Sequence, residues 1–220
     1  MAIDKIDVTK GITGVLPTAN LGSGTASSST VLYGDQTYKT APSGGLVLTG
    51  SSVSTTAASA ITITNCFSAT YQNYLVTGSM IPSTDGSNLR FRLHDGSNPL
   101  SGSSYAYATY QMRIDSGGFS ESTGGSHGAD HVQLTSGNSN HISNAAATRM
   151  FIFSPAVADY RTNALIDTIG YTGSNDLDRN VQQMKYNVAH TALGITLYAS
   201  SGDIDDLILE YMEWLIHKEI

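Results

Sequence analysis

The sequence predicts an all-β protein, an antiparallel sandwich or barrel that follows an extended N-terminal arm. Of its 220 residues, 28 are Ser, 24 are Thr and 22 are Gly, together a third of the chain, whereas charged residues make up 13%. From about Val53 onward, short runs of alternating apolar and polar residues are separated by Gly, Ser and Asn clusters, a pattern typical of strands joined by turns. The first 50 residues lack such runs. One domain with an extension suits this length.

The arm comprises residues 1–50. From Gly11 to Lys39, isolated apolar side chains stand among Gly, Pro and Ser, and no helical or strand period extends beyond about five residues. Alone, such a segment cannot bury enough apolar surface to offset an ordering entropy of ~1–2 kcal/mol per residue. It is therefore either a disordered linker or an arm that is ordered only against copies of itself or a partner surface. We favour the second interpretation.

Strands are predicted wherever the alternation is sustained. Leu89–Leu93 is the clearest, because its apolar residues lie on one face while Arg90 and Arg92 lie on the other. Ser83–Asn88 and His94–Pro99 contain the Asp-Gly pairs of tight turns, in which glycine accepts a positive φ. The predicted strands are 60–64, 71–80, 89–93, 105–114, 130–134, 148–153, 165–171, 180–186, 193–198 and 207–215.

A helix competes with a strand only in the last segment. A helical stripe would comprise Ile204, Ile208, Tyr211, Met212 and Leu215, whereas a strand would place Leu207, Leu209, Tyr211 and Leu215 on one face. The strands elsewhere favour a final core strand. Residues 203–220 contain six acids and one lysine, which accounts for −5 of the net −7. This terminus is either simply solvated or a patch for a basic partner.

The charge balance and the apolar pattern exclude several classes of function. Lys and Arg total 11 against 18 Asp and Glu, whereas a nucleic-acid binder needs clustered basic residues. No apolar run approaches the ~18–20 residues of a membrane helix, and Met1–Lys10 has no apolar stretch for a signal peptide. Cys66 is the only cysteine, so no intrachain disulfide can form. We expect neither nucleic acid nor a membrane as a partner.

Metal-ligand residue types occur in two short segments. His127-Gly128-Ala129-Asp130-His131, with His141 ten residues on, offers nitrogen ligands for zinc, but a Gly/Ser-rich stretch fixes no tetrahedral geometry. Asp176-Leu177-Asp178-Arg179-Asn180 alternates oxygen ligands as calcium loops do, but it lacks their later Gly and bidentate Glu. We favour solvated loop histidines and a polar turn, and expect no bound metal.

Catalytic and cofactor motifs are absent from the sequence. There is no G-x-S-x-G and no G-x-x-x-x-G-K-[ST], and Gly22-Ser23-Gly24 lacks the third glycine of a dinucleotide loop. Cys66 follows a predicted strand, which favours a small buried apolar residue over a reactive thiol. A glycosidase needs two carboxylates ~5–9 Å apart, but Asp-Gly turns explain Asp85 and Asp95 more simply. We expect no enzymatic activity and no cofactor.

The tyrosines of one predicted strand suggest sugar binding as one class of function. Tyr105 and Tyr107 share a face that Tyr110 does not, so no continuous aromatic platform follows, and strand propensity explains tyrosine there. We therefore favour packing in the core or an interface. Residues 116–147, dense in Gly, Ser, Asn and His, are expected to form the longest loop region and to hold any receptor contact.

Residues 14–38 resemble a segment that recurs in the fibres and appendages of tailed bacteriophages. The resemblance rests on Gly14–Pro17 (GVLP), Ala19–Gly22 (ANLG), Gly24–Thr30 (GTASSST) and Leu32–Tyr38 (LYGDQTY). In those proteins the segment commonly lies in a trimeric stalk. The resemblance implies that three copies of the chain supply together the core that one thin arm lacks.

A second resemblance, over about 61–212, is to jelly-roll domains of phage virion proteins. Phe67–Pro82 (FSATYQNYLVTGSMIP), Thr84–Gly86 and Leu89–Leu93 are similar to the opening of such domains, and Gly194–Ile204 to their closing pattern. These domains end in a short L-Y-G-I strand, where this chain has Asp206–Tyr211 and a Trp214-containing extension. The departure suggests a neighbour contact particular to this virion.

Together these observations predict a non-enzymatic structural protein of a phage virion. Residues 1–50 would trimerise the chain or attach it to capsid or tail proteins, and residues 51–220 would form a jelly-roll β-sandwich. The expected interface residues are Leu16, Leu21, Val31, Leu32 and Tyr33. The appendage is either a short fibre or a capsid decoration protein. The alternative is a carbohydrate- or receptor-binding module whose partner is a host surface glycan.

Overall fold

The computed structural model describes residues 22–27, 29–40 and 45–215. Apart from a 3-10 helix, η2 (Ile142–Asn144), every regular element in this part of the chain is a β-strand, which confirms the predicted all-β fold. The chain divides into two compact units, 1–44 and 45–220. The division falls just before the strand β3 (Gly45–Ser54), so this strand belongs to the second unit.

The described part of the first unit contains one small hairpin. β1 (Thr30–Leu32) pairs antiparallel with β2 (Tyr38–Thr40). In the turn, Asp35 accepts hydrogen bonds from the amide and hydroxyl of Thr37 at 3.0 and 2.6 Å, and Lys39 Nζ lies 2.6 Å from its second oxygen. These contacts lower the pKa of Asp35 to about 2, chiefly through the hydrogen bond from Lys39.

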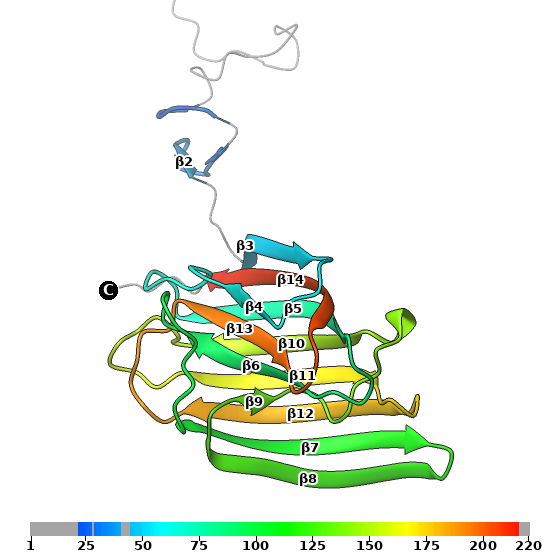
Figure 1. Cartoon of the computed structure of the whole chain (residues 1–220). Helices are drawn as coiled ribbons and strands as arrows, with labels where there is room; N and C mark the ends of the chain where they lie inside the picture. The colour runs from blue at the N-terminus through cyan, green and yellow to red at the C-terminus, as the bar shows by residue number, and fades with distance from the viewer. Residues whose placement is uncertain (1–21, 28, 41–44, 216–220) are drawn as a thin grey trace, which may run out of the picture. The chain divides into compact units, whose positions relative to one another are not determined.

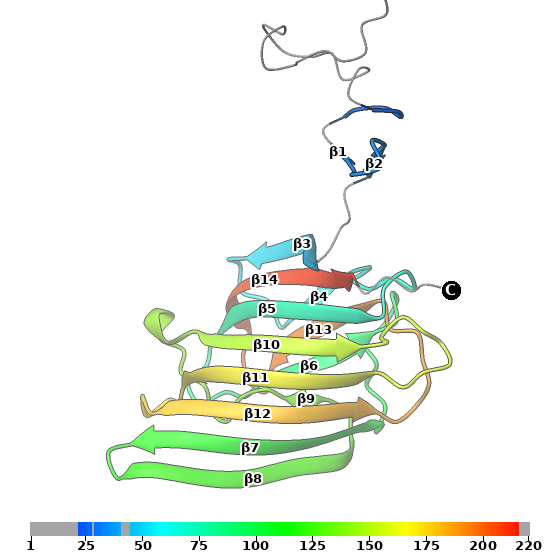
Figure 2. The same ribbon diagram turned by 180° about the vertical axis from the view of Figure 1, so that it is seen from behind.

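The second unit consists of two antiparallel sheets (Figure 1). The larger has eight strands, in spatial order β3, β14 (Ile204–Leu215), β5 (Asn73–Pro82), β10 (Ala146–Phe153), β11 (Asn163–Tyr171), β12 (Leu177–Tyr186), β7 (Tyr105–Asp115) and β8 (Gly118–Ala129). The smaller has four, in the order β4 (Ala60–Ile63), β13 (Gly194–Ala199), β6 (Leu89–His94) and β9 (Val132–Gln133). Figure 2 shows the large sheet from its other face.

The strand pairing follows one rule across both sheets. β3 pairs with β14, β4 with β13, β5 with β10 and β6 with β9, so the early strands pair with the late strands in reverse order. The hairpins β7–β8 and β11–β12 are inserted between these pairs and widen the large sheet on one side. The small sheet lies over part of the large one, and β7 and β8 extend beyond its edge (Figure 1).

One apolar core joins the two sheets into a β-sandwich. It contains Val76 and Met80 of β5, Met150 of β10, Phe91 of β6 and Leu197 of β13, all with no exposed surface. The inward positions change character across the large sheet. They are apolar on β14 and β5 and, apart from Thr148, on β10, whereas Asp178, Asn180 and Gln182 occupy the first three inward positions of β12. This change places a polar region where the cover of the small sheet ends.

The predicted strands all correspond to strands of the structure, including the final one. In β14, Leu207 and Leu209 are fully buried while Ile208 is 49% exposed, a period of two that excludes the helical alternative for residues 204–215.

The expectation of a long loop over residues 116–147 is wrong for residues 118–129. They form β8, paired with β7 along its whole length from Tyr105↔Ala129 to Asp115↔Gly118. Gly, Ser and His have little intrinsic strand preference, but the free edge of β7 supplies a continuous row of hydrogen-bonding partners. Ser116 and Gly117 link the strands, and Asp115 Oδ1 accepts the Gly117 amide at 2.7 Å. The segment Asp115-Ser116-Gly117-Gly118 is a hairpin signal that sequence reasoning missed.

Candidate functional site

The first candidate site is a polar cleft on the inner face of the β7–β8 hairpin. It is a cavity of about 170 Å³ whose walls come from β7, β8, β12, the end of β9 and the segment that follows β9. The side chains that define it are Tyr107, Thr109, Gln111, Ser122, Gln133 and Gln182. None of these six carries a charge at neutral pH. These six are the cleft residues.

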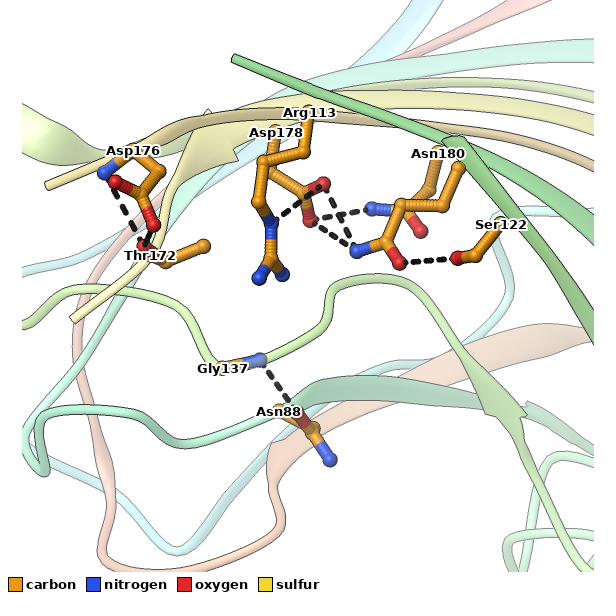
Figure 3. A network of polar contacts seen from close by, with 9 residues as sticks. Asn88, Arg113, Ser122, Gly137, Thr172, Asp176, Asp178 and Asn180 are labelled. Atoms are coloured by element: carbon orange, nitrogen blue, oxygen red, sulfur yellow. Dashed lines mark hydrogen bonds and ion pairs between the residues drawn. The ribbon is translucent and has the colours of Figure 1, made fainter. Parts of the chain in front are cut away.

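A buried carboxylate holds the floor of the cleft in place (Figure 3). Both oxygens of Asp178 accept from Gln111 Nε2, at 2.9 and 3.0 Å, and Oδ2 also accepts from Asn180 Nδ2 at 3.0 Å. Ser122 Oγ donates to Gln111 Oε1 at 2.9 Å. This chain of bonds crosses from β12 through β7 to β8, so the Gln111 amide is fixed at both ends.

Two polar atoms, one in the cleft and one in the adjoining depression, are buried without a hydrogen-bond partner among the described residues. Gln182, 4% exposed, donates from Nε2 to the Gln133 carbonyl at 2.7 Å, but its Oε1 accepts nothing. Arg113 Nε likewise has no hydrogen bond; it lies 3.8 Å from Asp178 Oδ1, within ion-pair reach only. A buried acceptor left unpaired costs ~1–3 kcal/mol, so Gln182 is a costly choice for a purely structural position.

A wider depression of about 610 Å³ adjoins the cleft and shares Ser136 with it. Its lining includes Asn88, Arg113, Gly137 and Asp176 (Figure 3). The Gly137 amide donates to Asn88 Oδ1 at 2.6 Å, and Asp176 Oδ2 accepts from the Thr172 hydroxyl at 3.2 Å. These bonds order the two loops that border the depression.

The second candidate site is the outer face of the large sheet, which faces away from the small sheet (Figure 2). Twelve of the seventeen large apolar side chains that are exposed in the described part of the chain lie at outward positions of its strands. They are Leu46, Leu48, Val53, Tyr110, Ile114, Phe119, Phe153, Leu165, Ile169, Tyr171, Val181 and Ile208. Exposed apolar patches of this kind mark interaction surfaces.

Basic residues lie at the centre of this outer face. Asp167 of β11 pairs with Arg179 of β12 through two hydrogen bonds of 2.9 Å and with Arg149 of β10 at 3.2 Å. The hydrogen bond from Arg179 is the main reason that the pKa of Asp167 is lowered. Lys185 occupies another outward position of β12, so β10, β11 and β12 present three bases against one acid.

The structure does not bring the metal-candidate residues together. His127 lies on β8, His131 Nδ1 lies 2.6 Å from Asp130 Oδ1, and His141 caps η2 by accepting from the Ser143 amide at 3.3 Å. Within residues 22–27, 29–40 and 45–215, no three His, Cys, Asp or Glu side chains are placed to share a metal ion.

Asp130 and the calcium-like segment have other partners. Asp130 also pairs with Arg92, whose guanidinium lies over the Tyr198 ring, 4.7 Å from its centroid. The pKa of Asp130 is lowered, first by the hydrogen bond with His131. In the calcium-like segment, Asp176 bonds within its turn, whereas Asp178 points into the sandwich and is held by two amides.

The other singled-out residues fill local roles. Cys66 is 3% exposed, which confirms the predicted burial, and burial raises the pKa of its thiol to about 12. Asp95 Oδ1 accepts the amides of Ser97 and Asn98 at 2.7 and 2.6 Å, as expected for a turn. Asp85 Oδ1 instead accepts the Asn140 amide at 3.3 Å and so links its turn to the loop before η2.

The tyrosines of β7 lie as their spacing predicts. Tyr105 is fully buried, with its ring 4.8 Å from that of Tyr186, and Tyr110 is on the opposite face, 40% exposed and bonded to Glu121. Tyr107 is half-buried in the wall of the polar cleft. Sequence reasoning therefore found Tyr107 and the polar segment that contains Asp178, but it assigned neither Gln111, Asp178 nor Gln182 to a cleft, because the pairing of β7 with β12 brings them together.

The predicted interface residues lie in the first unit. Val31 and Leu32 are 43% and 44% exposed on β1, and Tyr33 is half-buried with Lys39 Nζ 5.2 Å from its ring centroid. Leu16 and Leu21 lie outside the described residues. The roles of all five in an interface stay a prediction.

Comparison with known proteins adds no relative. No family model matches the chain, and none of the curated proteins or solved structures compared is similar to it. No helix in the described part of the chain is long and apolar enough to cross a membrane.

Proposed function

We propose that the protein is a non-enzymatic structural component of a phage virion, a trimeric surface appendage built on a jelly-roll sandwich. The observation that carries the proposal is the exposed apolar face of the large sheet, which a solitary domain would leave in contact with water. The resemblance of residues 14–38 to trimeric stalk segments, and of the sandwich to virion domains, supplies the biological setting.

The jelly-roll assignment is supported by the reverse-order pairing of the strands. A jelly roll is a long antiparallel ladder wrapped into two sheets, so that early strands pair with late ones. β3, β4, β5 and β6 pair in turn with β14, β13, β10 and β9, and the pairs alternate between the two sheets. The hairpins β7–β8 and β11–β12 are then additions to the large sheet.

The outer face is large enough for a stable subunit interface. Eight strands at a spacing of ~4.8 Å and about ten residues at ~3.3 Å each give a face of roughly 1,250 Å². A standard interface needs ~800 Å² from each partner. The apolar residues are spread from β3 to β8, so a partner could exclude water from most of the sheet.

We assign this face to a second copy of the chain on the basis of charge. Its centre carries Arg149, Arg179 and Lys185 against Asp167, whereas the chain as a whole has a net charge of −7. β14 carries Asp205, Asp206 and Glu210. In a ring of three, the basic centre of one copy can contact the acidic final strand of the next, a heterologous contact that closes on itself.

Native mass spectrometry tests the oligomeric state. The full-length protein is expected to be a trimer, and Ile169→Asp, which puts a carboxylate in the outer face, is expected to dissociate it. Ile142→Asp is the matched control, since Ile142 is a 78% exposed isoleucine on η2, outside this face. A monomeric full-length protein, or a trimer that survives Ile169→Asp unchanged, contradicts the proposed interface.

Deletion of residues 1–44 tests the arm separately, because residues 45–220 form a compact unit. Dissociation on deletion supports trimerisation by the arm, whereas a persistent trimer assigns the arm to attachment on the particle. The virion assignment itself requires that an antibody against the protein labels purified phage particles. Absence of the protein from particles would refute it.

A further inference from the structure

We propose that the polar cleft binds one neutral sugar residue of a glycan. The inference concerns the cleft residues on the inner face of β7, β8 and β12, and it does not depend on the oligomeric state. It therefore adds a binding activity to a protein whose proposed role is structural.

The size of the cleft fits one monosaccharide. Its volume of about 170 Å³ equals that of roughly six water molecules in the liquid. The β8 wall is kept low by Gly124 and Gly125. Gly125 has a φ of +151°, and a Cβ at this position would lie 2.4 Å from the Tyr107 carbonyl oxygen. At Gly125, β8 therefore approaches β7 more closely than a residue with a side chain would permit.

The chemistry of the lining is that of sugar recognition. Thr109 offers a hydroxyl and Gln133 offers its amide nitrogen, while the Ser122 hydroxyl, which donates to Gln111, can still accept, so both donors and acceptors for a sugar hydroxyl face the cavity. Tyr107 adds an aromatic ring that can cover the apolar C–H face of a pyranose while its hydroxyl stays polar. A few placed polar groups beside an aromatic surface are typical of small-molecule sites.

The unpaired acceptor on Gln182 is the observation that points to a ligand. This side chain is 4% exposed, its Nε2 is anchored on the Gln133 carbonyl, and its Oε1 accepts no hydrogen bond within the described structure. This oxygen has almost no accessible surface, so a sugar hydroxyl in the cleft can donate to it only after the amide turns toward the cavity. Because Nε2 is already anchored on the Gln133 carbonyl, only the oxygen end of the amide has to be reordered on binding.

The charges beneath the cleft favour a neutral sugar over an acidic one. Asp178 is the buried charge under the floor, and Arg113, at 3.8 Å, balances it. Its oxygens are occupied by Gln111 and Asn180, so it acts as a support that orients Gln111. An anionic sugar would find no unpaired cation among the cleft residues themselves.

The test uses the full-length protein and saturation-transfer NMR. The probes are the methyl glycosides of glucose, galactose, mannose, rhamnose and N-acetylglucosamine at millimolar concentration, and sialic acid serves as an acidic comparison. We expect saturation of at least one neutral glycoside and none of sialic acid. Failure of every neutral probe, or preference for the acidic one, overturns the proposal.

Variants then place the bound sugar. Tyr107→Ala removes the aromatic wall, and Gln182→Met removes the amide at nearly constant volume. Each variant is expected to weaken sugar binding at least ~10-fold, which is the effect of losing one good hydrogen bond or stacking contact. Tyr160→Ala, at an exposed loop position, is the control and should change affinity less than ~2-fold. If Gln182→Met fails to fold, Tyr107→Ala decides alone. A sugar that binds equally to Tyr107→Ala and Tyr160→Ala overturns the assignment to the cleft.

Discussion

Replacement of Tyr105 by Phe deletes a single oxygen atom from the core, and the structure allows its effect to be worked out. The Tyr105 hydroxyl accepts the Leu93 amide at 2.9 Å and donates to the Leu100 carbonyl at 2.8 Å. Its ring packs edge-to-face against Tyr186. Phe keeps the ring and its packing, so the variant isolates the two hydrogen bonds.

The expected loss of stability for Tyr105→Phe is ~1.5–4.5 kcal/mol. A buried amide without an acceptor costs ~1–3 kcal/mol, and the lost bond to the carbonyl adds ~0.5–1.5 kcal/mol. This is a large part of the ~5–15 kcal/mol that stabilises a typical domain. In a chain of this size, each kcal/mol lowers the Tm by ~2–4 °C, so the Tm should fall by ~3–18 °C.

Guanidinium unfolding followed by circular dichroism measures this change. The midpoint for Tyr105→Phe should fall while the m value stays constant, since the surface exposed on unfolding is the same. Tyr160→Phe is the control, because Tyr160 is 57% exposed, and it should change stability by less than ~0.5 kcal/mol. If the two variants are equally stable, the hydrogen bonds of the Tyr105 hydroxyl to Leu93 and Leu100 do not stabilise the fold.

The same variant has a signature at alkaline pH. Burial raises the pKa of Tyr105 above its ordinary value of 10.0. The stability contributed by this group is thus complete below pH 10 and is lost as the pH rises above 10, when the unfolded chain ionises first. Tyr105→Phe should reduce this decline by up to ~1.4 kcal/mol per pH unit. Burial also raises the pKa values of Tyr107, Tyr198 and Tyr211, so part of the decline should remain.

Three further predictions follow from local structure. Burial raises the pKa of the Cys66 thiol from 9.0 to about 12, so this thiol should not react with a thiol reagent at pH 8 until the protein unfolds. The stability that the buried neutral thiol contributes should be lost from pH 9 upward. Rapid labelling of the native protein would contradict its burial. Lys39→Ala should return the pKa of Asp35 from about 2 toward 3.8 in an NMR titration, and an unchanged value would mean that Lys39 is not its partner. Gly194→Ala should lower the free energy of unfolding by more than ~2 kcal/mol, because a Cβ there would lie 2.1 Å from a β4 carbonyl oxygen. Gly34→Ala is the control and should be near neutral, since the space around Gly34 is open. Similar unfolding midpoints for the two variants would show that β13 can shift.

Local pattern was sufficient for most strands of the sandwich. In Leu89–Leu93, each apolar residue turned inward and both arginines outward, because alternation along a strand is a property of the backbone alone. The same holds for Ile204–Leu215, where the exposure of Ile208 between two buried leucines confirms the strand. These segments needed no knowledge of their neighbours.

The strands β3 and β8 show where local pattern is insufficient. Their sequences, Gly45–Ser54 (GLVLTGSSVS) and Gly118–Ala129 (GFSESTGGSHGA), are too rich in Gly and Ser to predict a strand. Each forms because a neighbouring strand, β14 or β7, offers an edge of unpaired backbone groups. Whether such an edge exists depends on the whole sheet.

The sequence by itself determined the all-β class, the turns and most strand positions, because these follow from alternation and from residues that accept special backbone angles. Only the tertiary structure decided which face is inside where the two faces of a strand differ little in hydrophobicity. On β12, hydrophobicity would turn Val181 inward, but Val181 is 38% exposed and Gln182 is buried. The inward side is set by where the small sheet lies, and that arrangement depends on strands far apart in the chain. Both the apolar outer face and the polar cleft arise from this choice, so neither could be found from local pattern.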